Sequence, residues 1–293
     1  LFNVNENGIV RACRLNIESG CSQILPISLG AFDSKNTIIS MDYVSLAASS
    51  EYGYAGLDAN NINYKIFAYY LREAKAKFLF DWRDLKRFAK TYAVHHHINH
   101  INFSPCGKKI VFIFRYWVDN KRHDSLMSFC LITRKFTLIV HDQTVSHYCW
   151  VDKVNLLVWG VIDLAPGYFV LNIETQDIRL VLKIADGHPT YFADGIIITD
   201  RQVGNVIKGR EICAELWSLE NNRNCELLRI SHPWVTNSSV RADMHISLSE
   251  NGNMFQLDSW HDQEHRSVIV GKLPFSRAGV MDFLRSQQNG TLI

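Results

Sequence analysis

The chain has 293 residues, of which 47% are hydrophobic and 20% are charged, so it is able to bury a sizeable core. Its 31 basic and 29 acidic residues leave no excess of positive charge, which argues against a nucleic-acid partner. It contains no run of about 18 uncharged apolar residues, so we expect no membrane partner. The seven cysteines follow neither paired nor regular spacing, and we interpret them as reduced thiols in a cytoplasmic protein.

Short runs rich in β-branched and aromatic residues recur along the chain, each time after the same opening phrase. The phrase is His, two residues, a large apolar residue, three turn-forming residues and Gly, and it begins at His100, His188 and His245. A fourth copy begins at His147 and keeps the aromatic residue without the glycine. These histidines lie roughly 40 to 60 residues apart, which is the period of propeller blades. Each phrase therefore predicts the first turn of a four-stranded antiparallel unit.

In chain order, the pattern predicts one all-β domain over residues 1–293, a β-propeller of about six to seven four-stranded blades. A partial blade covers residues 8–27, and blade copies start near residues 27, 100, 147, 188 and 245, with Ile27 in place of histidine in the first of them. Because the chain begins in mid-blade, we expect either further sequence before Leu1 or completion of that blade by the C-terminal residues. Residues 81–97 and 276–288 are expected to hold short helices, and His95 to His97 a solvated loop.

The histidine that opens each blade has a consequence for function. The first strands of propeller blades line the central channel, so His100, His147, His188 and His245 are predicted to meet there. Clustered imidazoles favour the neutral form, and neutral imidazole is the commonest biological metal ligand. The alternative is that these histidines are polar residues bonded to water or backbone. The sequence leaves both interpretations open.

Residues beside these histidines extend the predicted site. Asp243 and His245 share one face of a strand, since side chains alternate, so Asp243 is a candidate ligand or orienting partner. Arg241 is further along that face, suited either to a substrate carboxylate or to an internal ion pair. Arg115 and Arg266 are additional candidate carboxylate binders, or exposed charges.

An inserted loop adds two aromatic candidates. It carries Tyr52 and Tyr54 in a glycine-containing stretch between two strands of the second predicted blade. Either tyrosine is placed to stack on a sugar, with Tyr54 also a candidate acid, or both simply pack the loop. No nucleophile elbow or phosphate-binding glycine loop is present, so nucleophilic serine or cysteine chemistry and phosphate binding by such a loop find no support.

The phrase HxxFSPxGKxIxF, which starts at His100, resembles the repeats of TolB-like propellers. Together with SHYCW at 146–150 and GHPTYFADG at 187–195, it resembles oligogalacturonate lyases, which are seven-bladed propellers that cleave pectin fragments by metal-dependent β-elimination. The phrase RxDxHxxxSxxG at 241–252 is similar to one in uncharacterised propellers that accompany polysaccharide-biosynthesis genes. The resemblance covers roughly residues 97–270.

The resemblance to the lyases implies roles for these residues. In the lyases a manganese ion is held by histidines and a glutamine, which implies His188 and His245 as ligands here. A separate histidine acts as the base, which implies His147. An arginine near the substrate carboxylate implies Arg115 or Arg241. The chain departs from that pattern, since the glutamine has no counterpart and Asp243 stands where a second histidine is expected. The cofactor expected is thus a divalent metal of the manganese or zinc class.

Two functions follow as hypotheses. The first is a metal-dependent lyase that cleaves an acidic, uronate-containing oligosaccharide or polysaccharide by β-elimination, with Tyr52, His100 and Arg266 binding substrate. Such a reaction needs charge neutralisation at the carboxylate and a base near neutral pKa. The second is a non-catalytic propeller that binds glycan or protein, for example in polysaccharide biosynthesis. Ring nitrogens that converge within about 4–5 Å of a common point favour the metal, because Zn–N bonds are about 2.0–2.1 Å long, whereas histidines buried against separate backbone partners favour the non-catalytic propeller.

Overall fold

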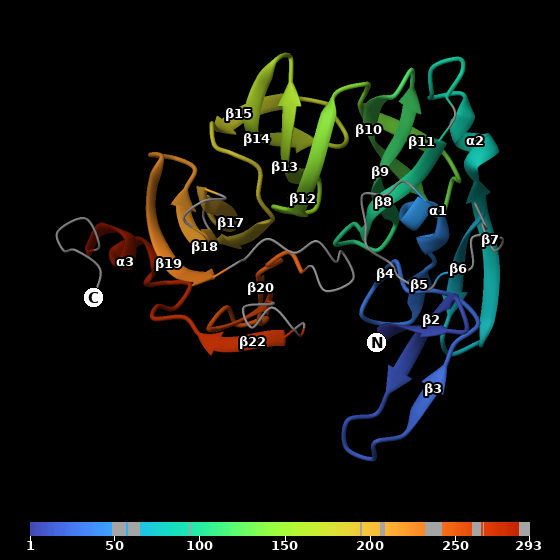
Figure 1. Cartoon of the computed structure of the whole chain (residues 1–293), viewed down its shortest axis with the longest axis horizontal. Coiled ribbons are helices and arrows are strands. Elements are labelled where there is room, and N and C mark those ends of the chain that lie inside the picture. Colours follow the sequence, from blue (N-terminus) through green and yellow to red (C-terminus); the bar gives the residue numbers. More distant parts are fainter. Residues whose placement is uncertain are drawn as a thin grey trace. The chain divides into compact units, whose positions relative to one another are not determined.

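The computed structural model describes residues 1–48, 57, 65–93, 95–193, 195–205, 209–231, 242–259, 265 and 267–286. These residues form six antiparallel sheets and three short helices (Figure 1). The chain divides into two compact units, residues 1–145 and residues 146–293. The single domain that the sequence predicts over residues 1–293 stays a prediction.

Three sheets belong to the first unit, and in each the strands pair antiparallel in chain order. The first contains β1 (Phe2–Glu6), β2 (Ile9–Leu15) and β3 (Ser22–Ile24). The second contains β4 (Ala31–Phe32), β5 (Thr37–Ile39), β6 (Lys65–Tyr70) and β7 (Lys75–Asp81), and the third β8 (His95–Phe103), β9 (Lys109–Val118), β10 (Lys121–Cys130) and β11 (Phe136–Val140). Helix α1 (Tyr43–Ala48) follows β5, and helix α2 (Trp82–Lys86) follows β7.

The core of the first unit lies between the second and third sheets. Phe80 of β7 packs on Phe112, Phe129 and Phe136, with ring centroids 4.9 to 5.5 Å apart. Seven consecutive residues of strand β9 are buried because both of its faces are covered, and the first five of them, residues 110–114, are apolar.

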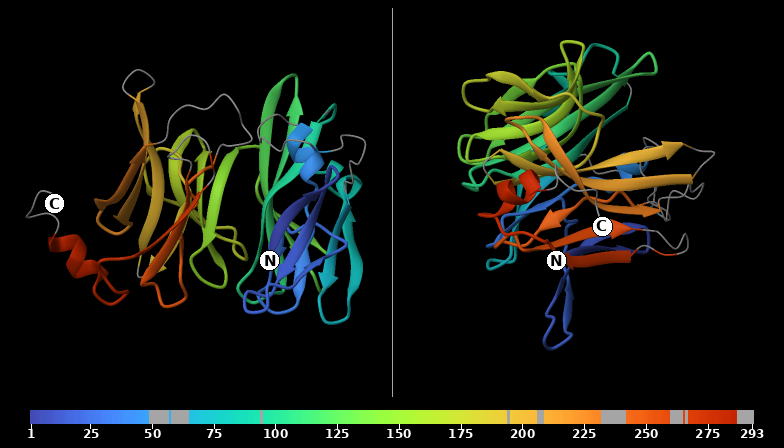
Figure 2. Two further views of the ribbon diagram at one scale, coloured as in Figure 1. Left: turned by 60° about the horizontal axis from the view of Figure 1, so that its bottom comes forward. Right: turned by 90° about the vertical axis from the view of Figure 1, so that its left-hand side faces the viewer.

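The second unit repeats the arrangement. Its sheets contain β12 (Thr144–Trp150), β13 (Asn155–Ile162), β14 (Ala165–Asn172) and β15 (Ile178–Leu182), then β16 (Pro189–Ala193), β17 (Ile196–Asn205), β18 (Gly209–Ser218) and β19 (Arg223–Ser231), and finally β20 (Ser247–Leu248), β21 (Met254–Ser259) and β22 (Ser267–Lys272). Helix α3 (Val280–Ser286) contacts β19, and both lie at the same end of this unit (Figure 2). Strand β16 contacts both β13 and β20, so its sheet packs against the sheets that precede and follow it in the chain.

The glycine of the opening phrase has a structural reason. Gly107, Gly195 and Gly252 have φ of 69°, 74° and 69°, and each lies in the turn between the first two strands of a sheet. Only glycine adopts this left-handed conformation without steric cost. The recurring phrase is therefore the sequence of one recurring turn.

The predicted solvated loop at His95 to His97 is wrong. These residues belong to β8, which pairs with β9, and His97 lies opposite Arg115 with 3% of its surface exposed. The strand begins ahead of the opening phrase because a bulge between Asn99 and Asn102 lets pairing continue across His100, whose φ is 49°. The two expected helical stretches do contain α2 and α3.

All seven cysteines are free thiols, and Cys13, Cys213 and Cys225 are buried. Within the part of the chain that the structure describes, no helix has the length and apolar character needed to cross a bilayer. The cytoplasmic location stays a prediction.

Candidate metal centre

Three of the four predicted histidines lie side by side in the second unit. His147 is on β12, His188 directly precedes β16, and His245 lies two residues before β20. The ring centroids are 3.9 Å apart between His147 and His188 and 3.8 Å apart between His188 and His245. The contacts of β16 with β13 and β20 are consistent with this, because they place the sheet of β16 against the sheet that contains β12 and the sheet that contains β20.

His188 is held by a buried carboxylate. Its Nδ1 lies 2.9 and 2.8 Å from the two oxygens of Asp200, and its backbone N–H donates to the same carboxylate at 2.7 Å. Asp200 is on β17 and only 2% exposed. Among the described residues, the other ring nitrogen of His188, Nε2, is buried and has no hydrogen-bond partner. An ionised carboxylate only accepts, so the neutral ring carries its hydrogen on Nδ1 and its lone pair on Nε2.

The backbone before His188 is fixed by close packing. A Cβ on Gly187 would lie 1.8 Å from the carbonyl oxygen of Asp200, so only glycine allows this approach. The hydroxyl of Tyr168 donates to the Gly187 carbonyl at 2.9 Å and lies 2.5 Å from the hydroxyl of Thr199. Tyr168 is fully buried. The position of the His188 ring is therefore set by β14 and β17 together.

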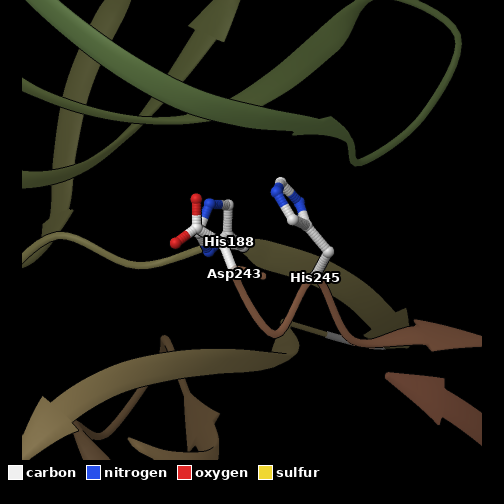
Figure 3. Close-up of side chains that lie close together, drawn as sticks. All are labelled: His188, Asp243 and His245. Atoms are coloured by element: carbon white, nitrogen blue, oxygen red, sulfur yellow. The ribbon is translucent and has the colours of Figure 1, made fainter. Parts of the chain in front are cut away.

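Asp243 and His245 reach the same place from one segment. Ala242, Met244 and Ile246 are buried, so the alternating residues Asp243 and His245 project to the opposite side. One ligand atom from each of His188, Asp243 and His245 lies within 4.8 Å of the others. Figure 3 shows the Asp243 carboxylate beside the His188 ring and His245 directed into the same space.

These three residues fit a divalent transition metal. Two imidazole nitrogens and one carboxylate oxygen are the ligand types that zinc, manganese and iron accept. Three protein ligands leave at least one coordination position for water or substrate. The Nε2 of His188, which has no hydrogen-bond partner among the described residues, is independent evidence for a bound ligand. A buried nitrogen without a hydrogen bond is costly in free energy unless something else binds it.

His147 makes a different set of contacts. Its Nδ1 lies 3.0 Å from Asp186 and 3.1 Å from the hydroxyl of Ser146. It lies outside the set of three that converges, although its ring touches that of His188. His147 is therefore placed beside the candidate metal position.

The pKa shifts of the residues in this cluster differ in direction. Burial lowers the pKa of His147 well below the ordinary value, and His188 and His245 lower it further. Burial also opposes the charging of His188, but the carboxylates of Asp200, Asp243 and Asp186 outweigh it and raise the pKa of His188. Burial would raise the pKa of Asp200, yet His188 lowers it through charge and hydrogen bonds. The pKa of Asp186 is raised, chiefly by burial.

Two further predicted site residues belong to the first unit. His100 is on β8 in the first unit, and its backbone N–H is bonded to Asn99. Arg115, on β9, is buried and its guanidinium is bonded to Asp124 at 2.7 Å and to the Val145 carbonyl at 3.3 Å. Four predicted residues lie outside the described residues, namely Tyr52, Tyr54, Arg241 and Arg266. Their roles stay predictions.

Asp200 is a site residue that the sequence analysis above does not single out. The pattern IIITD suggests a turn cap at the end of a strand, whereas Asp200 is buried in the middle of β17 and binds His188. The usable signal is that Arg201, Gln202 and Val203 follow Asp200 directly, with no turn-forming residue until Gly204. Tyr168 and Gly187 carried no signal, because their role depends on contacts between strands.

Comparisons with known proteins address the fold. Neither a protein-family model nor a curated protein sequence matches this chain. Among solved structures, TolB from Acinetobacter baumannii is similar with a TM-score of 0.56 at 11% identity, over 91% of this chain and 58% of that one. Oligogalacturonate lyase from Vibrio parahaemolyticus has a TM-score of 0.52 at 10% identity, over 93% of this chain and 85% of that one. The tricorn protease has a TM-score of 0.56 at 7% identity, over 98% of this chain and 33% of that one.

These likenesses define the fold class. The chain spans little more than half the length of TolB and a third of the tricorn protease. The predicted all-β propeller of antiparallel meanders is confirmed, with six sheets among the described residues. Its neighbours have different activities, and at these identities the likeness concerns the fold alone.

Proposed function

We propose that this protein is a metal-dependent lyase that cleaves an acidic, uronate-containing oligosaccharide or polysaccharide by β-elimination. The observation that carries the proposal is the convergence of His188, Asp243 and His245, with the Nε2 of His188 buried and unpartnered among the described residues. An oligogalacturonate lyase is among the solved structures that share the fold, so the fold is compatible with this reaction class.

His188, Asp243 and His245 would hold an ion of the manganese or zinc class. Such an ion supplies charge neutralisation at the uronate carboxylate, which acidifies the neighbouring C5–H bond. His147, beside that position, accepts the C5 proton as a neutral imidazole. The C4–O bond then breaks, a C4=C5 double bond forms, and the departing oxygen takes up a proton.

The arginine near the substrate carboxylate is the open part of this proposal. Arg115 is already bonded to Asp124, so we assign that role to Arg241. The predicted roles of Tyr52, Tyr54, Arg266 and His100 remain parts of the same proposal.

A screen of uronate polymers and oligosaccharides tests the proposal. Product carrying a C4=C5 double bond is followed by its ultraviolet absorbance, with the full chain loaded with Mn²⁺ or Zn²⁺ or treated with a chelator. We expect product only with metal, and its loss in His147→Ala without loss of bound metal. His141→Ala, at an exposed histidine of the first unit, is the matched control. Bound metal without product on any uronate substrate would contradict the lyase and leave the metal site standing.

The second candidate is a propeller that binds glycan or protein without catalysis. One observation favours it: the arginine predicted to clamp the substrate carboxylate, Arg115, is instead part of an internal ion pair. In that case the metal would serve to hold β16 and the segment before β20 together. The same screen, combined with glycan-binding measurements, distinguishes the two.

A further inference from the structure

A second carboxylate–imidazole pair lies directly beside the first. Asp186 Oδ1 is 3.0 Å from Nδ1 of His147, and the two side chains are 38% and 19% exposed. The first pair, Asp200 and His188, also meets at Nδ1. Since the two rings are 3.9 Å apart, two imidazoles with the same kind of carboxylate partner stand next to each other.

One short segment supplies a member of each pair. Asp186, Gly187 and His188 are consecutive, and Asp186 reaches back to β12 while His188 reaches across to β17. Gly187 between them is held by the Tyr168 hydroxyl and by its close approach to Asp200. A shift of this segment would therefore move both pairs, and its tight packing keeps both in place.

We propose that Asp186 is a positioning residue, which holds the hydrogen of His147 on Nδ1 and leaves the Nε2 lone pair to accept the substrate proton. The catalytic half of this inference rests on the proposed function, whereas the tautomer is a property of the resting protein. The two carboxylates then have parallel roles. Asp200 fixes the tautomer in which His188 binds metal, and Asp186 fixes the tautomer in which His147 accepts a proton.

Ser146 contacts both members of this pair, because its hydroxyl lies beside Nδ1 of His147 and also hydrogen-bonds to the Asp186 carboxylate. The Ser146 hydroxyl lies 3.1 Å from the same Nδ1, and a hydroxyl is able either to donate or to accept. If it donated to Nδ1, the ring hydrogen would move to Nε2 and His147 would no longer offer a lone pair there. An ionised carboxylate has no hydrogen to donate, so Asp186 selects the productive direction.

The tautomer of His147 tests this proposal in the absence of any substrate. Nitrogen-15 NMR of the full chain, labelled at histidine and examined metal-free and with Zn²⁺, reports which ring nitrogen carries hydrogen, and a His147→Gln variant assigns the signals. We expect the Nδ1–H form in the wild type. We expect a shift toward Nε2–H in Asp186→Asn, because the amide is able to donate to Nδ1. Ser146→Ala should keep the wild-type form, and Asp200→Asn should alter His188 alone.

Activity then separates this role from a structural one. Asp186→Asn should lower kcat by about 10²-fold or more, since general base catalysis contributes about 10²–10⁴-fold, with KM, Mn²⁺ affinity and unfolding midpoint unchanged. An Nε2–H form of His147 in the wild type, or an unchanged tautomer in Asp186→Asn, would overturn the proposal, and the wild-type spectrum decides even if the variant fails to fold. Failure of the lyase reaction alone would appear as absent product with the expected tautomers.

Discussion

Both carboxylate oxygens of Asp200 lie within 2.9 Å of Nδ1 of His188, and the same carboxylate accepts the backbone N–H of His188 at 2.7 Å. This arrangement fixes both the tautomer and the orientation of the ring. The lone pair of the neutral ring is therefore on Nε2, the buried nitrogen for which the described residues offer no hydrogen-bond partner. The candidate metal site depends on a carboxylate that does not itself belong to the converging set.

The first prediction concerns that carboxylate. Asp200→Asn should lower the affinity for Zn²⁺ or Mn²⁺ by about 10–100-fold, which is the usual effect of removing such a partner. Isothermal titration calorimetry of the wild type and the variant measures it. Asp258→Asn, at the end of β21, is the matched control because Asp258 is exposed. Equal affinities in wild type and Asp200→Asn would show that Asp200 does not orient a ligand.

The second prediction concerns the close approach at Gly187. Gly187→Ala places a Cβ against the Asp200 carbonyl oxygen, so the backbone must move at a cost of about 1–3 kcal/mol in the free energy of unfolding. Metal affinity should fall as well, because His188 is the next residue. Urea unfolding and metal titration measure both effects. Gly279→Ala is the control, since its Cβ would make only an ordinary contact at 3.4 Å, and similar losses in both variants would contradict the prediction.

The third prediction concerns pH and a histidine in the first unit. Burial, with the positive charge of Arg115 as the second cause, lowers the pKa of His97 from 6.5 to about 3. The unfolded chain then binds a proton that the folded chain does not, so the stability this histidine confers is present above pH 6.5 and is lost as pH falls from 6.5 toward 3. Between pH 6.5 and 5 the loss is about 2 kcal/mol for this group.

Urea unfolding of wild type and His97→Leu at pH 7.5 and pH 5.0 isolates this effect, because other titrating groups are common to both proteins. The wild type should lose about 2 kcal/mol more stability than the variant on acidification. Equal losses would mean that His97 is protonated at pH 5 in the folded protein.

The fourth prediction concerns Arg115. Its ion pair with Asp124 is buried, with 4% and 1% of the two side chains exposed. Arg115→Met should destabilise the protein by about 3 kcal/mol, because it removes the nearer of the two arginines that pair with the buried Asp124 carboxylate and leaves Arg122 at 3.5 Å. The double variant Arg115→Met/Asp124→Leu should recover much of that loss. If Arg115→Met were as stable as the wild type while losing affinity for uronate, the arginine would instead serve substrate.

The fold was predictable because its signals are local. The turn at Gly107, Gly195 and Gly252 requires glycine at a fixed position after a strand, so the repeat is visible in the amino-acid sequence. The same regularity pointed to His147, His188 and His245 as neighbours. Asp243 followed from alternation alone, since Met244 between it and His245 is buried.

The rest of the site was not predictable because it depends on contacts between sheets and on packing. The sequence around Asp200 is also that of a turn cap. Its role depends on the continuation of β17 beyond it and on its contact with His188. The sequence predicts Arg115 as a carboxylate binder or an exposed charge. Its ion pair depends on Asp124, which lies opposite it on β10. The polar residues at His95 to His97 predict a solvated loop, because the sequence gives no sign that β8 pairs with β9 there.

Metal content of the purified full chain tests the central claim most directly. Inductively coupled plasma mass spectrometry would compare the wild type with His188→Ala/His245→Ala after exposure to Mn²⁺ and Zn²⁺ and removal of excess ion. The account predicts close to one equivalent of metal in the wild type and a loss of nearly all of it in the double variant. No metal in the wild type, or equal metal in both proteins, would contradict it.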